Sequence, residues 1–239
     1  MPSSSSRWSL NIFQAILLIY ILSCQAKEKK ASTIDQVIQD PISVDTIDIL
    51  SANKLTLTEA YSLRHYGEET YRITPKIVVV HHTVIPTLEE TITLFKNDNL
   101  ADDRTDINKH SSLNVGIHYV IDKDGSIFHL MPDTIMARHI IGFNHVSIGI
   151  ENVARNSEEI TNEQLQSNAK LIHYLTDKHP TLQYLIGHDE YTNSTYPHWD
   201  LYLELDSSYL PHDKPDPGMK FMADLREKLS TEHGVVLEK

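Results

Sequence analysis

The chain has 239 residues, a formal net charge of −12 and a single cysteine. The negative charge argues against nucleic acid as a partner, because binding to phosphates requires a basic surface. Once an N-terminal segment is set aside, the remaining length is sufficient for one domain with a hydrophobic core.

The first residues predict export. Residues 8–22 form an apolar stretch after the single charge of Arg7, which is short for a membrane span but suits the core of a signal peptide. The stretch ends at Ser23-Cys24, which resembles the lipobox of bacterial lipoproteins. Because a lone cysteine cannot form an internal disulfide, this position favours lipid attachment over a structural use. We expect a signal peptide over residues 1–23 and a lipidated Cys24; an uncleaved anchor or a plain secretory signal is the alternative.

The resemblance to lipoproteins implies a lipid-anchored protein of the bacterial cell envelope, held at a membrane by its N-terminal lipid. Gln25, rather than an aspartate, follows the cysteine, which in a bacterium with two membranes fits the outer membrane and an orientation towards the periplasm. Residues 24–51 mix charged and polar residues with isolated Ile and Val, and we interpret them as a lipidated N-terminus and linker. The folded domain is expected over residues 52–239.

The apolar pattern of residues 52–239 predicts an α/β domain with a mixed central β-sheet flanked by helices. Helix signals include apolar spacing over 55–66, capping boxes that begin at Thr87 and Thr161, and a closing apolar stripe over 221–229. Strands are expected over 77–81, 117–122, 126–131, 146–152 and 182–187, with a hairpin turn at Asp124-Gly125.

Three side chains at the ends of strands or in loops form a candidate metal site. His81 ends the apolar run 77–80, His188 ends the run 184–187, and Asp216 lies in a Lys-Pro-Asp-Pro-Gly sequence. A catalytic zinc takes three nitrogen or oxygen ligands from the protein and keeps a fourth position open for water. The sequence therefore predicts a zinc hydrolase with Zn²⁺ at one edge of the sheet.

Six short motifs, in this order, resemble the zinc-dependent N-acetylmuramoyl-L-alanine amidases of the type 2 family, which includes AmpD-like enzymes and peptidoglycan recognition proteins. They are His81-His82-Thr83, Gly116-Ile117-His118-Tyr119, Asp124-Gly125, Ser147-Ile148-Gly149-Ile150-Glu151-Asn152, Gly187-His188 and Lys214-Pro215-Asp216-Pro217-Gly218. The resemblance extends from about Ile73 to about Leu229. It implies hydrolysis of the amide bond between N-acetylmuramic acid and L-alanine in peptidoglycan or muropeptides.

The resemblance also implies roles for individual residues. The family's three zinc ligands correspond to His81, His188 and Asp216. Its catalytic base corresponds to Glu151, and the lysine that stabilises the oxyanion corresponds to Lys214. Phage and animal relatives usually carry a tyrosine where this chain has Ile117, so the resemblance assigns the catalytic proton transfer to Glu151 alone.

Further residues are candidates for binding substrate. His139 and Asn144 lie just before the strand that carries Glu151, and we expect them to line the substrate groove. Residues 190–213 resemble an insertion of some bacterial envelope amidases, and their aromatic residues predict a loop over the zinc cleft in which Trp199 contacts glycan or peptide. His118 alternates with apolar neighbours on a strand, which favours a hydrogen-bonded structural role.

Two other functions compete with this interpretation. One is a module that binds peptidoglycan without cleaving it; the presence of all three ligands, Glu151 and Lys214 argues against it. The other is a zinc amidase or peptidase that acts on a different bond, which nothing in the sequence excludes. The sequence does not indicate an oligomeric state or a preference between intact cell wall and soluble muropeptides.

Overall fold

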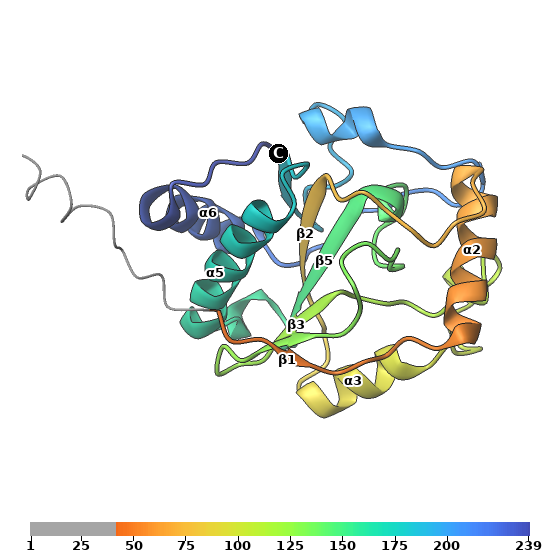
Figure 1. Ribbon diagram of the computed structural model, residues 1–239, viewed down its shortest axis with the longest axis horizontal. Coiled ribbons are helices and arrows are strands. Elements are labelled where there is room, and N and C mark those ends of the chain that lie inside the picture. Colours follow the sequence, from red (N-terminus) through yellow and green to blue (C-terminus); the bar gives the residue numbers. More distant parts are fainter. Residues whose placement is uncertain (1–41) are drawn as a thin grey trace, which may run out of the picture. The chain divides into compact units, whose positions relative to one another are not determined.

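A six-stranded mixed sheet forms the centre of residues 42–239, the part of the chain that the computed structural model describes (Figure 1). The predicted signal peptide, Cys24 and most of the predicted linker lie outside the described residues. In spatial order the strands are β1 (Asp45–Thr46), β4 (Ile127–His129), β3 (Tyr119–Ile121), β5 (Ser147–Asn152), β2 (Ile77–His82) and β6 (Tyr184–Gly187). The mixed α/β architecture predicted from the sequence is confirmed.

The four strands β3, β5, β2 and β6 run parallel, and β4 forms the predicted antiparallel hairpin with β3. Every residue of β2 is buried, as expected for an interior strand of a sheet covered on both faces. Because side chains alternate along a strand, Ile77 and Val79 belong to one core cluster, and Val78 and Val80 belong to another on the opposite face. His81 therefore lies on the same face as Ile77 and Val79.

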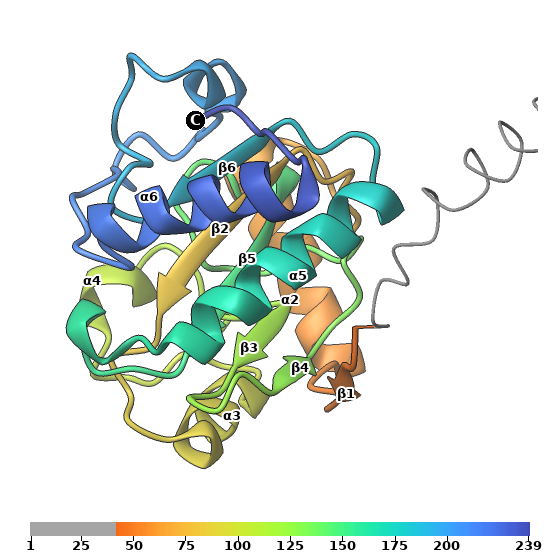
Figure 2. The same ribbon diagram turned by 90° about the vertical axis from the view of Figure 1, so that its left-hand side faces the viewer.

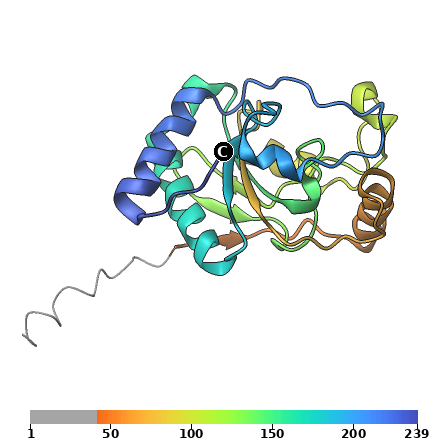
Figure 3. The ribbon, with the colours of Figure 1, turned by 90° about the horizontal axis from the view of Figure 1, so that it is seen from above.

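Two layers of helices cover the sheet. Helices α5 (Asn162–Lys178) and α6 (Met219–Lys228) pack on one face, and α2 (Ala52–Tyr66) and α3 (Leu88–Lys96) pack on the other (Figures 2 and 3). A short helix, α4 (Thr105–Asn108), precedes β3, and a π-helical turn over Leu229–His233 follows α6. Among residues 42–239, no helix combines the length and the apolar character needed to cross a bilayer.

Side-chain caps begin the helices where the sequence predicts them. Thr161 and Gln164 form the complete capping box of α5, and Thr87 accepts a hydrogen bond from the backbone N–H of Glu90 at the start of α3. The apolar stripe of α5 then buries Ala169, Ile172 and Leu175 against the sheet, as predicted.

The folded unit begins earlier than the predicted boundary at residue 52. Strand β1 pairs with β4, Ile49 is buried, and Ser51 caps α2 by accepting a hydrogen bond from the N–H of Lys54. Residues 42–51, which we expected to be part of a linker, therefore belong to the domain. A two-residue strand with exposed side chains is too short to show a period-two pattern in the sequence.

Candidate active site

The candidate site lies at the carboxyl ends of three parallel strands, β5, β2 and β6. Glu151 on β5 is the register partner of His81 on β2, and paired residues of neighbouring strands project from the same face. His188 follows β6 directly and donates its backbone N–H to the carbonyl of Val80 at 3.1 Å. Side chains at the carboxyl edge of parallel strands converge on one crevice, which is the usual position of ligand sites in such sheets.

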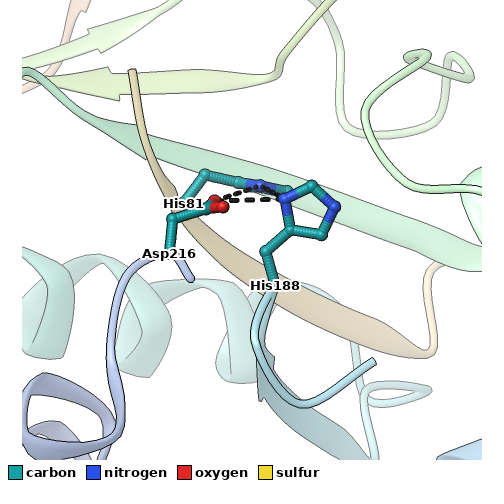
Figure 4. A group of neighbouring side chains, drawn as sticks. All are labelled: His81, His188 and Asp216. Carbon is teal, nitrogen blue, oxygen red and sulfur yellow. Dashed lines mark hydrogen bonds and ion pairs between the residues drawn. The ribbon is translucent and has the colours of Figure 1, made fainter. Parts of the chain in front are cut away.

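Asp216 reaches this crevice from the loop that precedes α6. Its carbonyl accepts a hydrogen bond of 2.7 Å from the N–H of Asp189, so the loop is attached next to His188. The three predicted ligands come together from distant parts of the sequence (Figure 4): His81 Nδ1 lies 3.0 Å from His188 Nδ1 and 3.3 Å from Asp216 Oδ2, and His188 Nδ1 lies 3.1 Å from Asp216 Oδ2.

These distances fit a tetrahedral metal ion. Zinc holds nitrogen and oxygen ligands at about 2.0 Å, which in a tetrahedron separates two ligand atoms by roughly 3.3 Å. Burial, and then the nearby His81 imidazole, lower the pKa of His188 to about 4, so its ring is neutral and has a lone pair for a metal at neutral pH. Although burial raises the pKa of Asp216, hydrogen bonds from His188 and His81 lower it far more, and the carboxylate is ionised.

Glu151 has the environment of an acid–base group. Its side chain lines the same pocket as the three ligands, and its Oε2 atom is buried with no hydrogen-bond partner among the described residues. Burial, and then the negative charge of Asp216, raise the pKa of the Glu151 carboxyl well above its ordinary value. A carboxyl in such surroundings takes up a proton readily.

A pocket of about 240 Å³ surrounds the ligands and Glu151. Lys214 lines it, so its ammonium group can interact with a ligand bound beside Asp216. Apolar and aromatic walls come from Ile140, Ile141 and Tyr209. The mixture of apolar walls with a few convergent polar groups is typical of a binding site for a small molecule or a substrate segment.

His139 lines this pocket and also contacts the candidate metal ligand His81. Its Nδ1 lies 3.0 Å from His81 Nε2, and its Nε2 lies 3.1 Å from the hydroxyl of Ser147. Burial is the largest cause that lowers the pKa of His139 well below its ordinary value, and the His81 imidazole is the next largest. The ring of His139 is therefore neutral. The sequence did not indicate this contact between the two histidines.

Asn144 has a structural position instead of the predicted place in the groove. It is buried, its Oδ1 accepts hydrogen bonds from the backbone N–H groups of His139 and Ile140, and its Nδ2 donates to the hydroxyl of Tyr61. Asn144 therefore holds the loop that presents His139. His118 has the predicted structural role, since its Nδ1 accepts from the N–H of Gly149 and its Nε2 donates to the carbonyl of Ile135.

Residues 190–213 contribute a wall of the pocket, although Trp199 is not one of the residues that line it. Trp199 stacks on Tyr202 at 4.6 Å and packs against Phe143. The pocket is lined instead by Tyr191, Tyr209 and His212. The hydroxyl of Tyr191 donates to the carbonyl of His212 and accepts from its N–H, which joins both ends of the segment.

Comparison with known proteins gives a family match and a similar fold. A family model described as N-acetylmuramoyl-L-alanine amidase matches residues 71–218. The solved structure of the endolysin amidase LysCS from Clostridium intestinale URNW is similar with a TM-score of 0.51 and 22% identity over 80% of this chain and 97% of its own, which supports the fold. No sequence among the curated proteins matches the chain.

Two further solved structures show weaker similarity. The Ph2119 endolysin from the Thermus scotoductus MAT2119 bacteriophage Ph2119 has a TM-score of 0.44 and 17% identity, covering 78% of this chain and 99% of its own. The bumblebee protein PGRP-SA has a TM-score of 0.39 and 23% identity, covering 52% of this chain and 76% of its own.

Proposed function

Because the chain belongs to the N-acetylmuramoyl-L-alanine amidase family, we propose that it hydrolyses the amide bond between N-acetylmuramic acid and L-alanine in peptidoglycan or muropeptides, with zinc as its cofactor. The observation that carries this proposal is the convergence of His81, His188 and Asp216 beside Glu151 in one pocket. Two imidazoles and one carboxylate, with the fourth position open to water, are one of the usual ligand sets of a catalytic zinc.

A secondary amide is a weak electrophile with a poor leaving group, so the site must supply a nucleophile, charge stabilisation and a proton. Zinc, when bound, makes hydroxide available at neutral pH by lowering the pKa of water to about 7. Glu151 accepts the proton of the attacking water on a carboxylate oxygen and returns it to the departing alanine nitrogen. Its raised pKa suits both transfers, because the carboxyl can hold the proton between the two steps.

Lys214 stabilises the negative charge that builds on the former carbonyl oxygen. Its side chain lines the pocket two residues before Asp216, and an ammonium group close to a cation is available for an oxyanion rather than for the metal. The apolar walls from Ile140, Ile141 and Tyr209 exclude water from the reacting bond and strengthen these electrostatic interactions.

Digestion of purified cell-wall sacculi, followed by mass spectrometry of the products, tests the proposal. We expect intact stem peptides with a free L-alanine N-terminus, and no release after treatment with a zinc chelator. Glu151→Gln should retain zinc and lose roughly 10² to 10⁴ in rate, the usual contribution of a catalytic acid–base group. Cleavage within the stem peptide would identify a peptidase, and binding to sacculi without any release would identify a recognition module; either result contradicts the proposal.

We also propose that the protein is located in the bacterial cell envelope and is anchored to a membrane by a lipid on Cys24. Because Gln25 follows the cysteine, we propose the outer membrane and an orientation towards the periplasm. The support is the apolar stretch over residues 8–22 and the lipobox-like end of that stretch, both in the sequence outside the described residues. The substrate class agrees with this location, because peptidoglycan lies in the envelope.

A further inference from the structure

The ring of His139 connects the candidate metal ligand His81 to Ser147. His81 directs Nδ1 towards His188 and Asp216, and its other nitrogen, Nε2, lies 3.0 Å from His139 Nδ1. On the opposite side of the His139 ring, Nε2 lies 3.1 Å from Ser147 Oγ. Both nitrogens of His139 are therefore occupied, which leaves neither for a substrate.

The bonding pattern determines which nitrogens carry protons. A ligating Nδ1 must be unprotonated, so the proton of a neutral His81 is on Nε2 and is donated to His139 Nδ1. His139 then carries its own proton on Nε2 and donates it to the hydroxyl of Ser147. Each ring is thus held in one tautomer and one orientation. Each ring donates its proton to the partner that lies farther from the metal site, His81 to His139 and His139 to Ser147.

From this chain of contacts we propose that His139 is a positioning residue, which holds His81 in the ring orientation and tautomer that bind zinc, with Ser147 as its anchor. The inference rests on the proposed zinc site. An outer partner of a metal-bound histidine is commonly a carboxylate or a carbonyl group, and a neutral imidazole that accepts a hydrogen bond can serve the same purpose.

Strand β5 is shaped to admit the ring. Ser147, Gly149 and Glu151 pair with Ile77, Val79 and His81, so all three lie on the face that carries His81. A Cβ atom on Gly149 would lie 2.9 Å from both Nδ1 and Cε1 of His139. The glycine therefore leaves room for the imidazole between His81 and Ser147, as strand glycines do where another group must come close.

The loop that carries His139 is held independently of the metal site. Asn144 accepts hydrogen bonds from the backbone N–H groups of His139 and Ile140, and it donates to Tyr61 on α2. Both Ser147 and Asn144 are buried, so neither contact is exposed to competing water. A ring fixed at its backbone and at its outer nitrogen can impose an orientation on His81.

Competition titration of zinc against a chromophoric chelator, with the full chain, tests the inference without any measurement of activity. His139→Ala should weaken zinc binding by about 10- to 100-fold, the usual effect of removing an outer partner of a metal ligand. His139→Asn should recover most of the affinity, because its Oδ1 can accept the hydrogen bond from His81 Nε2. Ser147→Ala should give a smaller loss, and it serves as the second variant if His139→Ala does not fold.

His173→Ala, on the remote helix α5, is the matched control and should bind zinc like the unmodified protein. Urea unfolding of each variant without metal separates a loss of fold from a loss of metal affinity. Equal zinc affinity in His139→Ala and the unmodified protein, with a raised KM, would assign His139 to substrate and overturn the inference. An unmodified chain that binds no zinc would remove the proposed cofactor itself, so the two failures are distinguishable.

Discussion

Asp216 and Lys214 are two residues apart in one loop, and the structure supports different roles for them. Asp216 Oδ2 lies within 3.3 Å of both histidine nitrogens, while Lys214 lines the adjoining pocket. Asp216→Ala should lose both zinc and activity, because two histidines alone hold the ion poorly. Lys214→Met keeps most of the side-chain volume, so zinc content should be unchanged while kcat falls by about 10² or more. Metal content by atomic emission, measured beside amidase turnover, checks both variants.

Either of two results would show that these roles are assigned incorrectly. One is a fully active Lys214→Met protein, and the other is an Asp216→Ala protein that retains stoichiometric zinc and turnover. Lys220→Met is a suitable control, since this exposed lysine on α6 forms its ion pair with Asp224 four residues later.

At the scale of single residues, the grouping of the candidate ligands could be predicted because each histidine directly follows an apolar run, and a buried strand places its last residue at a sheet edge. The role of His139 could not be predicted in this way. Its contact with His81 spans 58 residues of sequence and depends on the position of an irregular loop. Asn144 was placed in the groove for its proximity to Glu151 in sequence, but its amide satisfies backbone groups of the same loop.

Among the larger elements, residues 190–213 combine a packed part with a part that lines the pocket. Trp199 packs with Tyr202 and Phe143, and Tyr209 lines the pocket beside the candidate metal ligands. Trp199→Ala should therefore leave KM nearly unchanged and lower the free energy of unfolding, with each lost aromatic pair worth about 0.5–1.5 kcal/mol beyond the area that it buries. Tyr209→Ala should raise KM. Kinetics on muropeptides and urea unfolding of both variants check these two expectations. A KM that rises in Trp199→Ala but not in Tyr209→Ala would contradict them.

His118 connects β5 to the loop at Ile135 and makes the stability of the fold depend on pH. Burial lowers the pKa of His118 to about 4, against about 6.5 in an unfolded chain. Above pH 6.5 His118 is neutral in both the folded and the unfolded chain, so it does not lower the free energy of unfolding. As the pH falls from 6.5 towards 4, only the unfolded chain takes up the proton, so the free energy of unfolding should fall by up to about 1.4 kcal/mol per pH unit.

Urea unfolding at pH 7 and pH 5 measures this effect. For His118 the expected loss between these two values is about 2 kcal/mol. His118→Asn should be less stable at pH 7, because it loses buried hydrogen bonds, but its stability should change less between the two pH values. An identical pH dependence in the variant and the unmodified protein would show that other groups cause the loss.

The helices and the β3–β4 hairpin were predictable because their signals are local. Capping residues, the glycine of the turn and the apolar stripe of α5 all lie within a few residues of the elements that they define. Strand β1 has no such signal. Its two exposed residues gain their strand conformation only from pairing with β4, more than 80 residues later in the chain.

The boundary of the whole domain can be tested by truncation. A chain that begins at residue 42 keeps β1, the buried Ile49 and the Ser51 cap of α2, whereas a chain that begins at residue 52 loses all three. The cap contributes about 1 kcal/mol, and the burial of an isoleucine contributes about 1.5–3 kcal/mol. Thermal unfolding of the two chains should therefore show a lower midpoint for the shorter one. Equal midpoints would restore residue 52 as the start of the domain.

The attachment of the whole molecule to a membrane is proposed to depend on Cys24. A net charge of −12 offers no general electrostatic attraction to an anionic lipid surface, so stable association requires another source of free energy. Acyl chains supply about 0.8 kcal/mol per buried CH₂ group, and stable anchoring needs more than one chain. Cys24→Ala should move the protein from the membrane pellet to the soluble fraction of the envelope, while the neighbouring change Ser23→Ala, which keeps the cysteine, should leave it in the pellet. Fractionation and immunoblotting check this, and an unmodified protein already in the soluble fraction would refute the lipid anchor.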